Sequence, residues 1–389
     1  MAAAAFEVLS PDELRARTSL KWRLYGPDVL PLWVAEMDVL PAPEVVAALV
    51  KAAHTGDTGY PTPAPVYAEA FAAFAEQRWA WSPDPADTLV CADVMTGIRV
   101  LVAAVTQPGG AVVIPSPVYP PFAMSTRELG REVLAVPLTE AGRWDPEAIR
   151  AGLAQARAQA GPGSRPLLLL CNPHNPTGVV HRPDELASVG AIAAAADALV
   201  VVDEVHGPLT PPGATFVPWL SVVPSGVVVT SAAKAFNLAG LKAALLVAAP
   251  GQRALLRELP ESVRYGASHV GVLGHAAGYG ADRAWLDAVN ASIAGNRALL
   301  GRLLAEHLPE VGYREPAATY LAWLDVRRLG LGDDPAAVLL REARVGLMDG
   351  VAFGPGGAGF VRLNVACSAA VLTEAVERIA AAVRLRRDA

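Results

Sequence analysis

Short apolar runs alternate with longer segments of helical composition along the chain as far as Gly280. The runs are rich in leucine and β-branched residues, which is typical of strands that are buried on both faces of a sheet. We expect such strands at 111–114, 132–136, 167–171, 199–203, 227–231 and 241–248.

The segments between these runs have helical composition, and three of them begin at or near a proline, which is favoured in the first turn of a helix. We expect these helices at 96–105, 121–129, 146–160 and 183–196. Because strands and helices alternate, the pattern predicts α/β crossovers and a buried, mostly parallel sheet.

The pattern changes beyond Gly280. A long helix at 283–306 is followed by a strand at 319–326, another helix, a strand at 360–366 and a closing helix. The chain has 389 residues, more than one core usually supports, so we expect two domains. We predict an N-terminal segment at 1–48 that packs with the small domain, a large α/β domain at 49–282 and a small α+β domain at 283–389.

Composition narrows the classes of function. Hydrophobic residues make up 53% and charged residues 18%, with a formal net charge of -6 and no basic run, so a small molecule is a better candidate partner than nucleic acid. Cys91, Cys171 and Cys367 are far apart, which disfavours a disulfide scaffold, and the histidines lack metal-ligand spacing. We expect no signal peptide and no membrane span, and a cytoplasmic protein without a metal.

Polar residues follow three of the predicted strands. Asn172 comes after one strand, Asp203 ends the next, and Ser231 ends another, three residues before Lys234. Ligands gather at the carboxyl ends of strands in an open parallel sheet, so these residues should converge. Together they supply what pyridoxal phosphate requires: an amine for a Schiff base, a carboxylate for its ring nitrogen, and polar groups for its oxygens.

Lys234 is the candidate Schiff-base lysine and acid–base group, and Asp203 the candidate partner of the pyridine nitrogen. Asn175 and His206 are candidates to lie beside the phenolic oxygen. Each position also has a plainer interpretation: a surface lysine, a buried aspartate that caps the next loop, a turn asparagine and a loop histidine with satisfied hydrogen bonds.

The cofactor phosphate has a candidate cradle where a turn opens a helix. Its members are residues with free backbone N–H groups, a hydroxyl or a cation: Thr96, Gly97, Ile98, Ser231 and Lys242. Tyr119 is placed either to stack on the pyridine ring or to fill the core. Arg362 lies within an apolar strand, where its guanidinium needs a partner, either a substrate carboxylate or a structural salt bridge.

Taken together, these segments resemble fold-type I pyridoxal phosphate enzymes, and within them the MalY/PatB-type cystathionine β-lyase branch of the class I/II aminotransferase family. The histidines in Asn-Pro-His-Asn-Pro and Asp-Glu-Val-His favour this branch over ordinary aminotransferases. The resemblance covers nearly the whole chain and rests on 32–38, 117–122, 171–176, 203–206, 234–242, 319–325 and 362–367.

The resemblance implies a large domain with a seven-stranded sheet, a smaller α+β domain and a homodimer with shared sites. It also implies that Tyr60 of one subunit reaches the phosphate in the other, and that Ala35 contacts the substrate carboxylate beside Arg362. This chain departs from the family pattern at Glu36, at Met95 and Thr96, and at Ala233.

The reaction implied by the resemblance is carbon–sulfur β-elimination from L-cystathionine or a related cysteine S-conjugate, giving pyruvate, ammonia and a thiol. Lys234, Tyr119 and Asp203 are the catalytic candidates. An aminotransferase uses the same residues and remains an alternative, as does a non-catalytic regulatory protein on the same scaffold.

Overall fold

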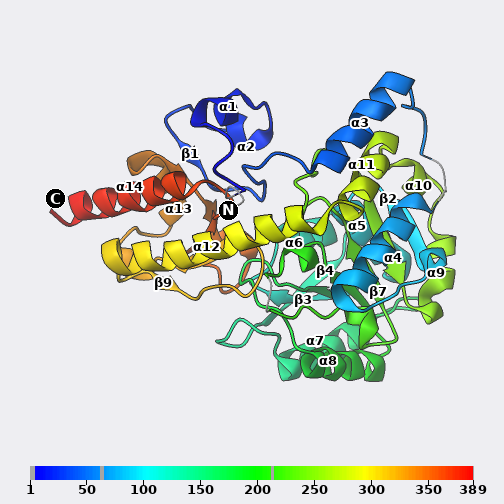
Figure 1. The fold of residues 1–389 in the computed structure, drawn as a ribbon. Coiled ribbons are helices and arrows are strands. Elements are labelled where there is room, and N and C mark those ends of the chain that lie inside the picture. The colour runs from blue at the N-terminus through cyan, green and yellow to red at the C-terminus, as the bar shows by residue number, and fades with distance from the viewer. Residues whose placement is uncertain (1–4, 62–64, 212–213, 389) are drawn as a thin grey trace.

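The computed structural model describes residues 5–61, 65–211 and 214–388. Its largest element is a seven-stranded sheet with the strand order β2-β8-β7-β6-β5-β3-β4 (Figure 1). Only β8 runs against its neighbours, so the prediction of a mostly parallel sheet is confirmed. The strands are β2 (Thr88–Cys91), β3 (Ala111–Ser116), β4 (Glu132–Pro137), β5 (Leu167–Cys171), β6 (Leu199–Asp203), β7 (Val227–Thr230) and β8 (Ala244–Ala248).

Helices cover both faces of this sheet. Side chains alternate along each strand, so Leu167 and Leu169 pack with α5 and α6, whereas Leu168 and Leu170 pack with α7 and α8. The helices around the sheet are α4 (Val66–Trp79), α5 (Val94–Val105), α6 (Pro121–Glu128), α7 (Pro146–Gln159), α8 (Pro183–Ala195), α9 (Arg253–Glu258), α10 (Ser262–Tyr265) and α11 (His269–Tyr279).

A four-stranded sheet with the order β12-β13-β10-β9 forms the centre of the second structural region. The long helix α12 runs from the helices around the large sheet to this smaller one (Figure 1). In this sheet, the antiparallel pairing of β10 with β13 places Arg362 directly opposite Trp323. The elements are α12 (Arg283–His307), β9 (Gly312–Tyr313), β10 (Leu321–Asp325), α13 (Pro335–Glu342), β11 (Val345–Gly346), β12 (Met348–Asp349), β13 (Phe360–Asn364) and α14 (Ala369–Asp388).

The N-terminal segment contacts both regions. Asn364 of β13 donates to the Glu36 carbonyl, while Asn237, just after Lys234, donates to the Met37 carbonyl at 2.9 Å. A buried ion pair between Lys21 and Asp38, 2.7 Å long, fixes the same stretch. The segment contains α1 (Pro11–Ala16), α2 (Leu20–Arg23) and β1 (Leu30–Pro31), and it leads into α3 (Pro43–Thr55).

The parallel strands of the large sheet end on the side that faces this segment and β13. Asp203 ends β6, Asn172 follows β5, and Ser231 follows β7. Residues from the large sheet, the small sheet and the N-terminal segment therefore meet at one place. None of the helices in the described residues is both long and apolar enough to cross a membrane. The proposed boundaries at residues 48 and 282 stay a prediction.

Candidate active site

Lys234 lies in the turn that follows β7, and its ammonium group points toward the N-terminal segment. Its Nζ donates to the carbonyl oxygen of Ala35 at 3.1 Å. Burial, together with the positive charge of Arg362, lowers the pKa of Lys234 to about 8. The amine therefore loses its proton more readily than an ordinary lysine, and a nucleophile or a base must be neutral.

Asp203 is the buried carboxylate of the site, with only 4% of its surface exposed. Its Oδ1 accepts a hydrogen bond from the backbone N–H of Val205 at 3.0 Å, and its other oxygen has no partner among the described residues. Burial raises the pKa of Asp203 to about 7. A cationic N–H donor at the free oxygen would restore the ionised form, so the carboxylate suits a protonated ring nitrogen.

Arg362 projects from β13 into the same space and is 2% exposed. Its Nη1 donates to Asn175 Oδ1 at 3.0 Å, and its Nη2 donates to the Trp33 carbonyl at 3.2 Å. The guanidinium pairs with no carboxylate in the described part of the chain, and its buried Nε has no hydrogen-bond partner there. Burial lowers the pKa of Arg362 to about 10. A buried cation in this state is a receptor for an anionic group.

His206 and Tyr119 line the region around these charges. His206 is buried, its Nδ1 has no partner among the described residues, and burial lowers its pKa to about 3, so the ring is neutral. Burial raises the pKa of Tyr119, and the positive charge of Arg362 partly offsets this rise. The Tyr119 ring packs edge-on against Phe122. Tyr119 and His206 therefore lie around the three charged groups, while their roles beside the cofactor stay a prediction.

The predicted phosphate cradle has a different geometry from the expected turn. Helix α5 begins at Val94, so Thr96, Gly97 and Ile98 lie inside it. The N–H of Thr96 is bonded to the Asp93 carboxylate at 2.8 Å, and that of Gly97 to the Asp93 carbonyl. The expectation that these N–H groups are free is wrong, because Asp93 caps the helix. An aspartate three residues before Thr96 is a sequence signal for this cap.

Ser231 and Lys242 lie on the same side as this helix end. Lys242 Nζ is 3.1 Å from Asp93 Oδ2, on a half-exposed surface. The Ser231 hydroxyl donates to the Ala243 carbonyl at 2.8 Å and accepts from the Ala233 N–H. Two residues that could hold a phosphate thus lie here, but Lys242 is paired with Asp93 and Ser231 is hydrogen-bonded to backbone groups.

Tyr60 is not part of this assembly within one chain. It is 85% exposed and packs edge-on against Tyr265, with ring centroids 6.5 Å apart. Its predicted role in a neighbouring subunit therefore stays a prediction.

The structure adds residues that the sequence analysis did not single out for the site. The Tyr320 hydroxyl donates to the Ala35 carbonyl at 3.1 Å, so it shares an acceptor with Lys234. Behind Ser231, the buried Tyr67 hydroxyl and His275 Nδ1 lie 3.1 Å apart. The sequence signal for Tyr320 is its place just before a buried strand, whereas nothing local indicates Tyr67 or His275.

Comparison with known proteins places the whole chain in a family. Residues 27–379 match the model for "Aminotransferase class I and II". A Mycobacterium tuberculosis protein named "Putative cystathionine beta-lyase" is 46% identical over 402 residues, covering 98% of each chain. The Corynebacterium glutamicum cystathionine beta-lyase is 34% identical, covering 95% of this chain and 98% of the relative.

A solved structure agrees with this relationship. Cystalysin from Treponema denticola, whose crystal structure contains a pyridoxal 5'-phosphate cofactor, superposes with a TM-score of 0.87 and 26% identity. The alignment covers 97% of this chain and 98% of cystalysin. With a family model that spans most of its length and relatives above 30% identity, this chain belongs to the aminotransferase class I and II family.

Proposed function

We propose that this protein is a pyridoxal phosphate-dependent carbon–sulfur β-lyase that cleaves L-cystathionine or a related cysteine S-conjugate. The products are pyruvate, ammonia and a thiol. Relatives named as cystathionine beta-lyases support the substrate class, and the buried guanidinium of Arg362 carries the structural part of the proposal.

The residues present fit the cofactor. Asp203 has one oxygen without a hydrogen-bond partner among the described residues, which suits a ring N–H. His206 Nδ1 is a buried polar atom without a partner there, and Lys234 has a lowered pKa. When bound, pyridoxal phosphate supplies an aldehyde that condenses with amines and a ring that accepts the electrons of a broken Cα–H bond.

The substrate carboxylate is bound by Arg362, with Asn175 beside it. The two Nη atoms of Arg362 contact Asn175 and Trp33 at 3.0 and 3.2 Å, so the guanidinium is held in place before a ligand arrives. This contact orients the amino acid with its Cα–H toward Lys234.

Lys234 then takes the α-proton at its Nζ. The electron pair left by this proton forms a Cα=Cβ bond as the Cβ–S bond breaks, and the sulfur leaves as a thiolate. Water then hydrolyses the released 2-aminoacrylate to pyruvate and ammonia. Asp203 would keep the nitrogen of the bound ring protonated, and Tyr119 would pack against that ring. Lys234, Tyr119 and Asp203 are the proposed catalytic residues. The end of α5, Ser231 and Lys242 are the proposed phosphate contacts, and a phosphate there would displace the Asp93 carboxylate from the Thr96 N–H and from Lys242.

We also propose that two copies form a homodimer in the cytoplasm. Exposed apolar side chains support the dimer: Tyr265, which packs against Tyr60, is 54% exposed, and Val50 of α3 is 48% exposed. The three cysteines are buried and unpaired, which supports a reducing compartment.

The products of one incubation distinguish the lyase from an aminotransferase. We expect the holoprotein and L-cystathionine to give pyruvate and free homocysteine, with the cofactor recovered as pyridoxal phosphate. Conversion of the cofactor to pyridoxamine phosphate, with a keto acid that retains the sulfur, would replace the lyase by the aminotransferase. Chromatography of products and cofactor from the same sample measures both outcomes.

A further inference from the structure

A cavity of 660 Å³ lies between the large and small sheets, outside the candidate active site. One wall comes from the ends of β3 and β4 and the loop at 138–142, and the other from β9, β10 and β13. Neither Lys234 nor Arg362 lines it. Its size falls within the range of small-molecule sites.

A tethered loop separates the cavity from the active site. The Ser116 hydroxyl is within hydrogen-bond distance of the Phe353 and Pro355 carbonyls, at 3.3 and 3.0 Å. The Phe353 ring lies 5.0 Å from the Trp323 ring on one side and 5.0 Å from the Arg362 guanidinium on the other. The two spaces are therefore neighbours with a packed side chain between them.

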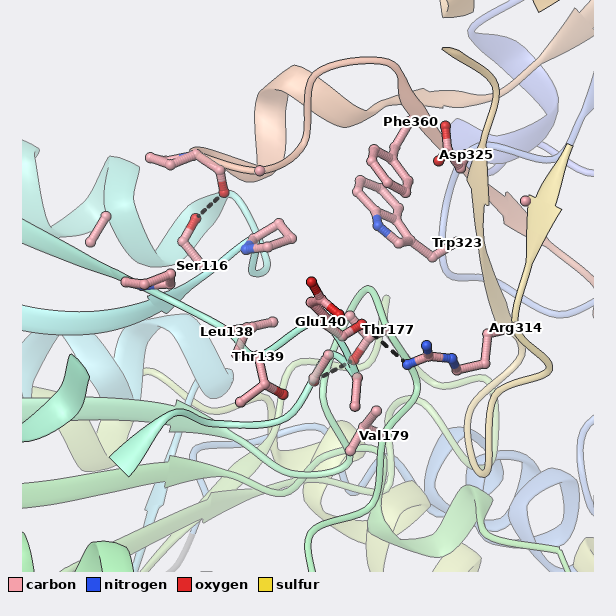
Figure 2. A pocket seen from close by; sticks show the side chains of 18 of the residues that line it. Ser116, Leu138, Thr139, Glu140, Thr177, Val179, Arg314, Trp323, Asp325 and Phe360 are labelled. Atoms are coloured by element: carbon pink, nitrogen blue, oxygen red, sulfur yellow. Dashed lines mark hydrogen bonds between the residues drawn. The ribbon is translucent and has the colours of Figure 1, made fainter. Parts of the chain in front are cut away.

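The small-sheet wall of the cavity is aromatic. Trp323 and Phe360 are stacked with ring centroids 5.1 Å apart and an angle of 7° between their planes. Both rings face the cavity in Figure 2. The indole N–H of Trp323 makes no hydrogen bond within the described ranges. This wall suits a planar ligand group.

Of the charges at this wall, two are already paired with each other. Asp325 accepts two hydrogen bonds from the Arg327 guanidinium, at 2.9 and 2.6 Å, and this guanidinium lies 5.1 Å from the Phe360 ring. This pair is satisfied without a ligand.

Arg314 and Glu140 differ from that pair. Arg314 Nη1 contacts only the backbone carbonyl of Glu140, at 3.4 Å, and neither charged group forms an ion pair within residues 5–61, 65–211 and 214–388. Figure 2 shows both side chains reaching into the same space below Trp323 and Phe360. The cavity thus offers one cation and one anion that have no ion-pair partner among the described residues, next to an aromatic wall.

We propose that this cavity is a second ligand site, which binds a free α-amino acid with a planar aromatic side chain. Its carboxylate contacts Arg314, its ammonium contacts Glu140, and its ring packs on Trp323 and Phe360. Arg314 belongs to the small-sheet side and Glu140 to the large-sheet side, so a bound amino acid bridges the two sheets.

Calorimetry with three probes tests this site: L-phenylalanine, 3-phenylpropionate, which lacks the ammonium, and 2-phenylethylamine, which lacks the carboxylate. Holoprotein carrying Arg362→Ala is the background, because it removes the carboxylate receptor of the active site. We expect L-phenylalanine to bind about tenfold or more tighter than either single-charge probe, since it alone satisfies both charges.

Variants assign the two charges. In Arg314→Gln, L-phenylalanine should bind no more tightly than 2-phenylethylamine. In Glu140→Gln, it should bind no more tightly than 3-phenylpropionate. The matched controls Arg15→Gln and Asp12→Asn change one exposed charge of each sign on α1 and should leave binding unchanged. All four positions are at the surface, so folding should be preserved.

Two results would overturn the proposal: no binding of L-phenylalanine at millimolar concentration, or binding that is equally strong in both cavity variants. The wild-type lyase assay does not depend on this site, so failure here is distinguishable from failure of the proposed function.

Discussion

Burying the guanidinium of Arg362 without an anion costs free energy, and the described part of the chain supplies no anion beside it. Asn175 and Trp33 hold its two Nη atoms, but amide and carbonyl oxygens carry no net charge to balance it. Sequence alone left open whether the partner is a structural carboxylate or a substrate. Among the described residues the structural salt bridge is absent, because Arg362 lies beside polar neutral groups.

Replacing Arg362 with alanine should mainly impair substrate binding. We expect kcat/KM for L-cystathionine to fall about 10- to 100-fold, largely through KM, because a charge-assisted contact to the carboxylate is lost. Steady-state kinetics measure this, with the exposed Arg150→Ala on α7 as control. An unchanged KM would show that the carboxylate binds elsewhere.

The lowered pKa of Lys234 gives a pH dependence. In cofactor-free protein the amine reacts only when neutral, so the rate of pyridoxal phosphate uptake should rise with pH and level off above its pKa of about 8. With an ordinary lysine, whose pKa is 10.5, the rate would level off only near that pH. Visible absorbance after mixing measures the rate. A rate that keeps rising through pH 10 would contradict the lowered pKa.

At the scale of elements, apolar runs predicted β5 and β6 with the observed limits, because buried parallel strands have a strong local signal. They did not predict that β8 runs antiparallel, since a strand buried on both faces has the same pattern in either direction. The four-residue strand β2 was missed. The N-cap of α5 by Asp93 was also not predicted, although aspartate is a common N-cap residue.

Gly97 shows how tightly α5 packs on the sheet. A Cβ at this position would lie 2.6 Å from Leu246 Cδ2 and 3.2 Å from Cys91 Sγ. We expect Gly97→Ala to destabilise the protein by about 1–3 kcal/mol, because the gain in helix propensity is smaller than the cost of overpacking.

Gly295 in α12 is the matched control for this prediction. A Cβ there would meet nothing within 4 Å, so Gly295→Ala should stabilise by about 0.5–1 kcal/mol. Urea unfolding of both variants gives the comparison. A Gly97→Ala variant that gains as much as Gly295→Ala would mean that α5 is free to move.

At the scale of the whole molecule, the site exists only because three parts of the chain meet. Lys234 comes from the large sheet, Arg362 from the small one, and Ala35 from the N-terminal segment that the buried Lys21–Asp38 pair fixes. Sequence patterns place each residue on its element, but the contacts of Tyr320 and Trp33 depend on tertiary packing. Neither sequence patterns nor the contacts within one chain can place Tyr60 of a partner subunit at the site.

The proposed dimer can be tested by mixing two impaired variants. If Tyr60 serves the site of the other subunit, Tyr60→Ala and Lys234→Ala should each lose activity. Hybrids formed by unfolding and refolding an equal mixture should regain about a quarter of wild-type activity, because half of the dimers contain one intact site. A mixture no more active than its components, or a monomer by sedimentation, would contradict shared sites.

Lys234 is the proposed acid–base group of the carbon–sulfur β-elimination. The most direct measurement is the simultaneous release of pyruvate and homocysteine from L-cystathionine by wild-type holoprotein and by Lys234→Ala. We predict equal, catalytic amounts of both products from the wild type and at least a 1,000-fold lower rate from the variant, within the range that enzymatic groups contribute (about 10²–10⁴ for proton transfer alone). Undiminished release by Lys234→Ala, or pyruvate without thiol from the wild type, would contradict the account.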